Sequence, residues 1–153
     1  MNHEMDLVYS GNTVVDAVIC GVLGNTGIQD IKFEYKGKLK RKIGIEDVDL
    51  CTVLANILEN AVEACERYDG KRYIRMEIAT YKSNLFITVC NPCRQNRKEF
   101  MKEWRTEKRD KEYHGYGMQN MKAVAERYNG SILFEEKEGE FTVKVHLEEK
   151  KII

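Results

Sequence analysis

The stretch LCTVLANILENAVEACERY, residues 50–68, decides the fold because it is the strongest helix signal in the chain. At about 100° per residue its apolar side chains gather on one face, which is enough to dock a helix on a sheet. This apolar set is Cys51, Leu54, Leu58, Ala61, Val62 and Cys65. Asp47 or Asp49 can open the helix, and Asp69-Gly70 is typical of a helix end.

The segments on either side of this helix predict a sheet built mostly of hairpins. We expect strands at residues 31–37, 72–81, 84–91, 131–138 and 140–149, and shorter helices at 14–23 and 118–128. Lys82-Ser83 joins two strands with the length of a hairpin turn. Asn12 or Thr13 can cap the first helix, and Asn129-Gly130 ends the last. The predicted class is α+β, a two-layer α/β sandwich with helices on one face of a mixed sheet of about five strands.

Length and charge limit the class of protein. A chain of 153 residues fits one domain, so we predict that residues 1–153 form a single domain. The 25 Lys and Arg equal the 25 Asp and Glu, which gives no support for nucleic-acid binding or membrane contact. The sequence contains no apolar run near the ~18–20 residues of a membrane span and no signal peptide pattern. We therefore expect a soluble, cytoplasmic protein.

The polar face of the central helix has an unusual composition. Its side chains are Thr52, Asn56, Glu59, Asn60 and Glu63. Such a face is often simply solvated, but a plain solvent face favours Lys, Glu, Gln or Arg over asparagine, a poor helix former. Asn56 and Asn60 lie one turn apart and project in parallel. They suit a hydrated Mg²⁺ and the phosphates that it bridges, because an amide oxygen can ligate a hard cation or hold its waters.

The motif HGYGMQNM occupies residues 114–121, at the end of a long polar stretch. We predict that this stretch, residues 92–116, is a lid that covers a binding site. Because a helix begins here, free N–H groups and the positive end of the helix dipole can face an anion. Glycine permits close approach to phosphate oxygens. Lys108, Arg105 and Arg109 supply positive charge upstream. Without the neighbouring motifs, a solvated segment and a flexible turn would explain the same residues.

The segment ITVCNPCRQ, residues 87–95, allows two interpretations. Cys90 and Cys93 have the C-x-x-C spacing of zinc and dithiol sites, but tetrahedral zinc needs four ligands and no second C-x-x-C or His pair is nearby. Asn91 ends a strand, and its amide presents a donor and an acceptor, as one edge of adenine does. An asparagine here can also simply form a turn. We favour Asn91 over the cysteines as the functional residue.

The other three cysteines lie within apolar patterns. They are Cys20, Cys51 and Cys65, and in such patterns a thiol acts as a small hydrophobic group. We therefore predict no disulfide framework.

Taken in order, these motifs resemble the ATP-binding domain of the GHKL superfamily. That superfamily includes gyrase-type ATPases, heat-shock chaperones, mismatch-repair ATPases and sensor histidine kinases. NILENAVEA resembles the N box, ITVCN stands in place of the first glycine box, and HGYGMQNM resembles the second, so the resemblance covers about residues 10–147. It is closest to the AgrC/VirS-like peptide-sensing histidine kinases of Gram-positive bacteria. The resemblance implies the GHKL histidine-kinase ATPase fold with ATP and Mg²⁺ as ligands.

The resemblance also implies roles for single residues. Asn60 would be the Mg²⁺ ligand, and Asn56 would lie beside the phosphates. Asn91 stands where most of the superfamily has an aspartate that contacts the adenine amino group.

The lid motif would complete the nucleotide site. Gly115 and Gly117, with Tyr116 between them, would let the lid approach the phosphates. Lys108 and His114 would reach the γ-phosphate and, with Asn56, form the catalytic set.

Three departures from the superfamily pattern are informative. Hydrolytic members carry a glutamate at the position of Asn56, where it activates water as a general base. An amide cannot take that proton, which favours phosphoryl transfer to an external acceptor. Glu63 reverses the charge of a basic residue found in many histidine kinases, and the first glycine box is reduced to Asn-Pro-Cys.

The resemblance implies the Mg·ATP-binding catalytic domain of a two-component sensor histidine kinase, either cytoplasmic or the cytosolic portion of a membrane-bound sensor. Its partners would be a histidine-bearing dimerisation domain of the same kinase and then a response regulator. His3 and His146 lack a helical context and His114 lies in the lid motif, so we expect no autophosphorylation without a separate phosphoacceptor domain. The alternatives are a stand-alone GHKL serine kinase of the anti-sigma type and a non-catalytic nucleotide-binding module.

Overall fold

The computed structural model describes residues 8–25, 30–94 and 115–151. Its elements are α1 (Thr13–Gly24), β1 (Ile31–Lys36), α2 (Asp47–Glu66), β2 (Arg72–Tyr81), β3 (Asn84–Pro92), α4 (Gly115–Arg127), β4 (Ser131–Lys137) and β5 (Glu140–Glu148). Every helix and strand predicted from the sequence is present, with ends shifted by a few residues. None of the helices in these ranges is long and apolar enough to cross a membrane.

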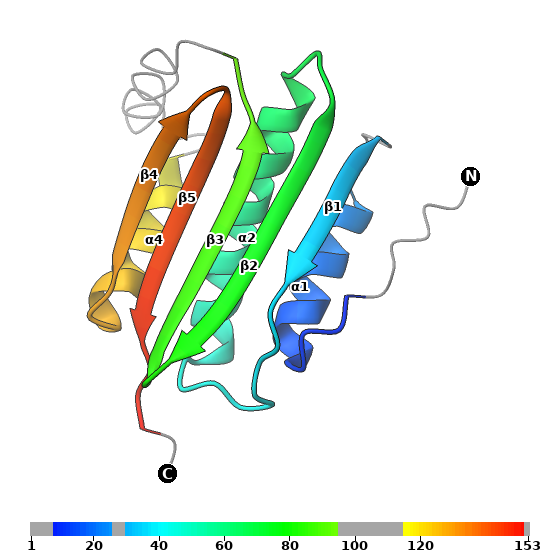
Figure 1. The fold of residues 1–153 in the computed structure, drawn as a ribbon. Coiled ribbons are helices and arrows are strands. Elements are labelled where there is room, and N and C mark those ends of the chain that lie inside the picture. Colours follow the sequence, from blue (N-terminus) through cyan, green and yellow to red (C-terminus); the bar gives the residue numbers. More distant parts are fainter. Residues whose placement is uncertain (1–7, 26–29, 95–114, 152–153) are drawn as a thin grey trace.

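The strands form one five-stranded mixed sheet in the order β1-β2-β3-β5-β4. β1 runs parallel to β2, and the other neighbouring strands are antiparallel. Figure 1 shows α1, α2 and α4 covering one face of this sheet. The predicted two-layer α+β sandwich is therefore confirmed, and the opposite face of the sheet, which we call the open face, is not covered by any described helix.

Local turn chemistry sets the register of the β2–β3 hairpin. Lys82 and Ser83 have φ angles of 44° and 64°, so both central residues are left-handed. That conformation matches the twist of two-residue hairpin loops. It places Tyr81 opposite Asn84 and fixes the alternation of β3, whose Leu85, Ile87 and Val89 are buried.

The buried face of α2 is wider than the sequence predicts. Its buried residues are Asp49, Leu50, Val53, Leu54, Ile57, Leu58, Ala61, Val62 and Cys65. The helix contacts α1 on one side, α4 on the other, and the sheet beneath, so more than one stripe is covered. Cys51, predicted to be in the apolar face, is only half-buried, and Cys20 on α1 is exposed, contrary to the prediction that it acts as a core residue.

The helix α2 begins at Asp47, as the sequence predicts, and Asp49 also lies in its first turn. The preceding residue, Glu46, makes no side-chain cap bond. Asp49 is buried, where it accepts a hydrogen bond of 2.7 Å from the Tyr128 hydroxyl and pairs with Arg127. The carboxylate thus ties the start of α2 to the end of α4.

The Asp49 carboxylate makes stability depend on pH. Burial opposes its ionisation, but the hydrogen bonds from Tyr128 and Arg127 and the charge of Arg127 outweigh burial, so its pKa lies below the usual 3.8. A lowered pKa stabilises the fold above the unfolded-state value, and this contribution is lost as pH falls through the folded-state value.

We expect Asp49→Ala to lower the free energy of unfolding by about 1–3 kcal/mol at neutral pH, because the buried Tyr128 hydroxyl loses its acceptor. Urea unfolding measures this, and the difference from wild type should shrink at acidic pH. Asp47→Ala, an exposed carboxylate in the same turn, is the control and should change stability by less than about 0.5 kcal/mol. Equal losses for the two variants, or a loss independent of pH, would contradict the assignment.

Candidate functional site

Three elements meet at one end of the molecule and carry the predicted site residues. Figure 1 shows that α2 and β3 end at this end and that α4 begins there. Asn56 and Asn60 lie on α2, Asn91 lies on β3, and Gly115, Tyr116 and Gly117 form the start of α4. Lys108 and His114, and most of the predicted lid, lie outside the described residues.

Asn56 and Gly117 meet directly, which joins α2 to the first turn of α4. A Cβ atom at Gly117 would lie 2.5 Å from Oδ1 of Asn56, so only glycine fits without displacing that amide. The Asn56 amide is also fixed from its other side, because its Nδ2 donates a 2.7 Å hydrogen bond to the carbonyl oxygen of Thr52. The structure therefore holds the oxygen of Asn56 against the glycine motif.

Asn60 lies one turn beyond Asn56 on the polar side of α2. Its side chain is half-buried, as is that of Glu63, whereas Glu59 between the two asparagines is exposed. The parallel projection of Asn56 and Asn60 follows from their spacing on a regular helix. Both asparagines therefore line the side of α2 that meets α4.

Asn91 is the last helix-facing residue of β3 before Pro92. It continues the buried row of Leu85, Ile87 and Val89, and only 2% of its surface is exposed. Its Nδ2 donates a 3.0 Å hydrogen bond to the carbonyl oxygen of Pro92. This bond fixes the plane of the amide at the end of the strand, so the residue is held more rigidly than a turn asparagine on the surface.

The two cysteines of the C-x-x-C segment occupy different environments. Cys90 lies on the open face of the sheet, with its Sγ 3.3 Å from Oγ1 of Thr142. Cys93 belongs to the hydrophobic core, and its backbone N–H donates to the Gly139 oxygen at 2.8 Å. All five cysteines are free. Among the described residues there is no group of three or more His, Cys, Asp and Glu side chains that could hold a metal ion.

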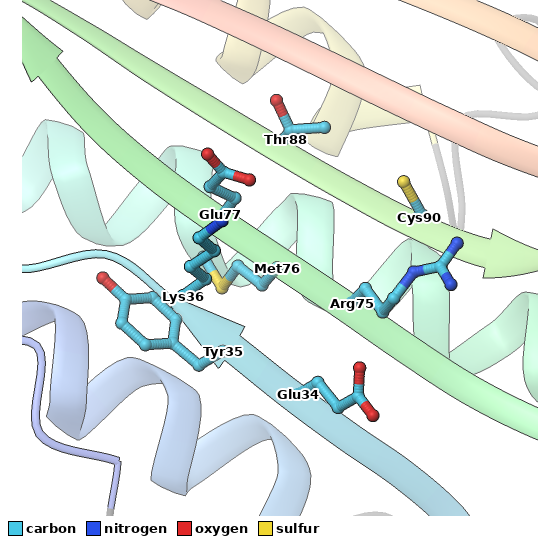
Figure 2. Close-up of a pocket in the computed structure, with 8 residues that line it drawn as sticks. All are labelled: Glu34, Tyr35, Lys36, Arg75, Met76, Glu77, Thr88 and Cys90. Atoms are coloured by element: carbon cyan, nitrogen blue, oxygen red, sulfur yellow. The ribbon is translucent and has the colours of Figure 1, made fainter.

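A hollow of about 420 Å³ lies on the open face, away from the asparagines. Figure 2 shows its lining, which consists of Glu34, Tyr35, Lys36, Arg75, Met76, Glu77, Thr88 and Cys90. Arg75 pairs with Glu140, and its guanidinium lies 4.9 Å from the centre of the Tyr73 ring. Burial and a 2.6 Å hydrogen bond to Glu140 raise the pKa of Tyr73. None of Asn56, Asn60 and Asn91 lines the hollow, so it is separate from the candidate site.

Several positioning contacts in the site could not be read from the sequence. The carbonyl oxygens of Thr52 and Pro92 orient the two amides, and a backbone oxygen carries no sequence signal. Arg94 and Asp69 form an ion pair of 3.6 Å that joins the residues following β3 to the α2–β2 connection. Both side chains are exposed, so this pair contributes little stability.

The fold is that of histidine-kinase catalytic domains. The catalytic domain of histidine kinase ThkA matches with a TM-score of 0.70 at 14% identity, over 89% of this chain and 90% of that one. The histidine kinase domain of the blue-light activated histidine kinase from Erythrobacter litoralis EL346 matches with a TM-score of 0.67 at 9% identity, over 88% and 58%. Histidine kinase AdeS of Acinetobacter baumannii matches with a TM-score of 0.61 at 11% identity, over 90% and 64%. At these identities the likeness establishes the fold alone.

The family follows from the sequence itself. Residues 45–148 match the GHKL domain, and this range includes α2, β3, α4 and the two last strands. The chain belongs to the GHKL domain family. No curated protein sequence matches it.

Proposed function

We propose that residues 1–153 form the Mg·ATP-binding catalytic domain of a sensor histidine kinase of the AgrC/VirS-like group. The domain transfers the γ-phosphate of ATP to a histidine on a separate dimerisation domain of the same kinase, which then passes it to a response regulator. The contact between Asn56 on α2 and Gly117 on α4 carries the proposal, because it joins the asparagine helix to the glycine motif. Membership of the GHKL domain family and the histidine-kinase fold support it.

The phosphates lie against the first turn of α4 in this proposal. The positive end of the α4 dipole and free N–H groups there attract an anion, and Gly115 and Gly117 let the phosphates approach the backbone. Tyr116 belongs to the same binding motif. Lys108 and His114, which precede α4 in sequence, supply charge to the γ-phosphate.

The donor set near Asn60 fits Mg²⁺ bound through a nucleotide. The described residues offer no carboxylate cluster for a metal, but Mg²⁺ commonly takes one or two protein oxygens and completes its shell with phosphate and water. Asn60 supplies such an oxygen from its amide. When bound, Mg²⁺ neutralises phosphate charge.

Asn91 reads the adenine base in this proposal. Its amide is held by the hydrogen bond to the Pro92 oxygen, which leaves Oδ1 as an acceptor of fixed direction. The amino group of adenine donates to such an acceptor, whereas guanine presents an oxygen at the same place. The site therefore prefers ATP to GTP.

Asn56 directs the reaction away from hydrolysis. An amide cannot accept the proton of an attacking water, so it does not act as a general base. The acceptor histidine attacks the γ-phosphorus, the bond to the bridging oxygen breaks, and ADP leaves. Catalysis comes from positioning and charge neutralisation, as in other phosphoryl transfers.

We expect Gly117→Ala to weaken Mg·ATP binding by about tenfold, because the new methyl group displaces the Asn56 amide at a cost of about 1–2 kcal/mol. Global stability should change less, since alanine is the better helix former by about 1 kcal/mol. Calorimetry and thermal unfolding measure the two effects. Ala123→Gly, on the exposed side of the same helix, is the control that should lower stability without changing nucleotide affinity.

Labelled phosphate transfer tests the proposed function. The protein is mixed with γ-labelled ATP and either an isolated histidine-kinase dimerisation domain or a small serine-bearing antagonist of the anti-sigma type. Acid-labile label on the dimerisation domain supports the proposal. Acid-stable label on the antagonist would instead identify a stand-alone serine kinase.

A nucleotide-binding module without catalysis is the second candidate. It is favoured by the Asn-Pro-Cys segment, which replaces the glycine-rich first box of the superfamily. Mg·ATP binding without transfer to any histidine-bearing domain supports this candidate. The absence of binding at millimolar Mg·ATP would exclude every nucleotide function.

A further inference from the structure

The connection between β1 and α2 contains a basic loop, residues 38–42, with the sequence KLKRK. Lys38, Lys40, Arg41 and Lys42 are exposed, and only Leu39 is buried. Figure 1 shows that this connection lies at the end of the molecule opposite the ends of α2 and β3. The loop is therefore far from the candidate nucleotide site, and the proposed function assigns it no role.

The backbone of the basic loop is fixed by several hydrogen bonds. The N–H of Leu39 donates to the Ser10 oxygen at 2.6 Å, and Nδ2 of Asn12 donates to the oxygens of Lys40 and Arg41 at 3.4 and 3.2 Å. Gly37 enters the loop with a φ of +132°, where a Cβ atom would overlap the Ile78 oxygen. The cationic side chains thus project from an ordered backbone, and little order has to be gained when a partner binds.

The basic loop itself carries four positive charges and no acidic side chain. None of the four cationic side chains of the basic loop forms an ion pair with another described residue. Two further cations, Lys82 and Lys150, lie nearby. The N–H of Lys150 donates to the oxygen of Gly44, just after the loop, at 2.8 Å, and the N–H of Glu149 donates to the oxygen of Ser83, next to Lys82, at 2.7 Å. Acidic side chains at this end of the molecule include Asp16, Glu46, Asp47, Asp49, Glu148 and Glu149, so the excess of positive charge is confined to the basic loop. Asp16 and Glu149 accept from the N–H groups of Ser10 and Gly44, both at 2.9 Å.

Exposed hydrophobic side chains accompany this charge. Tyr9 is 86% exposed, Val48 is 72% exposed and Tyr81 is 65% exposed. Tyr9 precedes Ser10, which holds the basic loop, Val48 lies in the first turn of α2, and Tyr81 ends β2 at the hairpin. Tyrosine combines an apolar ring with a polar tip and is enriched at membrane interfaces beside Lys and Arg.

We propose that this end of the molecule docks on the anionic surface of a phospholipid bilayer. Clusters of four or more Lys and Arg bind anionic lipid headgroups, and the exposed tyrosines add contacts in the interface that a purely ionic partner does not need. The docked orientation leaves the candidate nucleotide site facing away from the bilayer. Whole-chain charge balance predicts no membrane contact, but that balance averages the basic loop with the rest of the chain.

Vesicle co-sedimentation of the full 153-residue chain tests the proposal. The probes are vesicles of phosphatidylcholine alone and of phosphatidylcholine mixed with phosphatidylserine. The test variant is Lys38→Gln/Lys40→Gln/Lys42→Gln, and the matched control is Arg67→Gln/Lys71→Gln/Lys137→Gln, which removes the same charge from exposed positions at the other end. Thermal unfolding establishes that both variants are folded.

We expect the wild type and the control variant to bind the vesicles that contain phosphatidylserine and not those of phosphatidylcholine alone. The test variant should bind the anionic vesicles roughly fivefold more weakly for each basic side chain removed. Tyr81→Ser should reduce the part of the binding that survives raised salt. Binding by none of the proteins, equal binding to neutral vesicles, or an equal loss in the control variant would each overturn the proposal. Binding to duplex DNA or to polyglutamate as tight as that to vesicles would overturn the lipid assignment.

Discussion

Asn60→Ala is expected to weaken Mg·ATP binding by about 100-fold, corresponding to about 3 kcal/mol. In the proposed function the Asn60 amide supplies the protein oxygen of the Mg²⁺ shell, and the described residues contain no cluster of His, Cys, Asp and Glu that could replace it. Water can take the vacated place in the octahedral shell, but it no longer links the cation, and the phosphates that the cation bridges, to the protein. The same substitution leaves ATP affinity without Mg²⁺ nearly unchanged.

Calorimetric titration with ATP, in the presence and absence of Mg²⁺, measures this effect. Glu59→Ala is the matched control, because Glu59 is the neighbouring residue on α2 and its side chain is exposed. It should keep the wild-type affinity under both conditions. Asn60→Ala should also melt close to wild type, since the side chain is only half-buried. An unchanged Mg·ATP affinity would refute the alignment of this helix with the N box.

The sequence predicts the elements of the fold because local signals agree with one another. The apolar period of residues 50–68, the alternation in the strands and the Lys82-Ser83 turn each specify structure within a few residues. The failures come from contacts distant in sequence. Asp49 is predicted only as a residue that can open the helix, but Arg127 at the end of α4 and Tyr128 just after it make it a buried acceptor. Cys20 reads as a core residue, but α1 leaves it exposed.

For the candidate site, too, the sequence predicts the residues but not the contacts between distant segments. Residue types identify Asn56 and Asn60 as candidates because asparagine inside a helix has a cost that a plain surface does not require. Asn91 is a candidate because its amide presents a donor and an acceptor at a strand end, and the glycine motif because it opens a helix. What the sequence does not contain is their contact geometry. The approach of Gly117 to Asn56 and the bond from Asn91 to the Pro92 oxygen arise only when the sheet brings α2, β3 and α4 to one end.

Asn91→Ala is expected to weaken ATP binding by about 10- to 100-fold while leaving the weak binding of GTP unchanged. The proposed hydrogen bond from the adenine amino group needs the acceptor Oδ1, which alanine lacks. Asn84→Ala is the matched control, because it makes the same chemical change at the other end of β3, where Asn84 bonds the Lys82 oxygen and His146. That variant should keep the preference of the wild type for ATP.

Asn91→Asp separates base recognition from folding. The carboxylate keeps an acceptor oxygen, so the preference for ATP over GTP should survive, but it cannot donate to the Pro92 oxygen. Because Asn91 is only 2% exposed, an unpaired carboxylate beside that carbonyl should lower the thermal stability of the variant. Competition binding with ATP and GTP, with a thermal melt of each variant, resolves the two effects. If Asn91→Ala stays folded and keeps the wild-type nucleotide preference, Asn91 does not read the base and the adenine must contact another group at this end of the sheet.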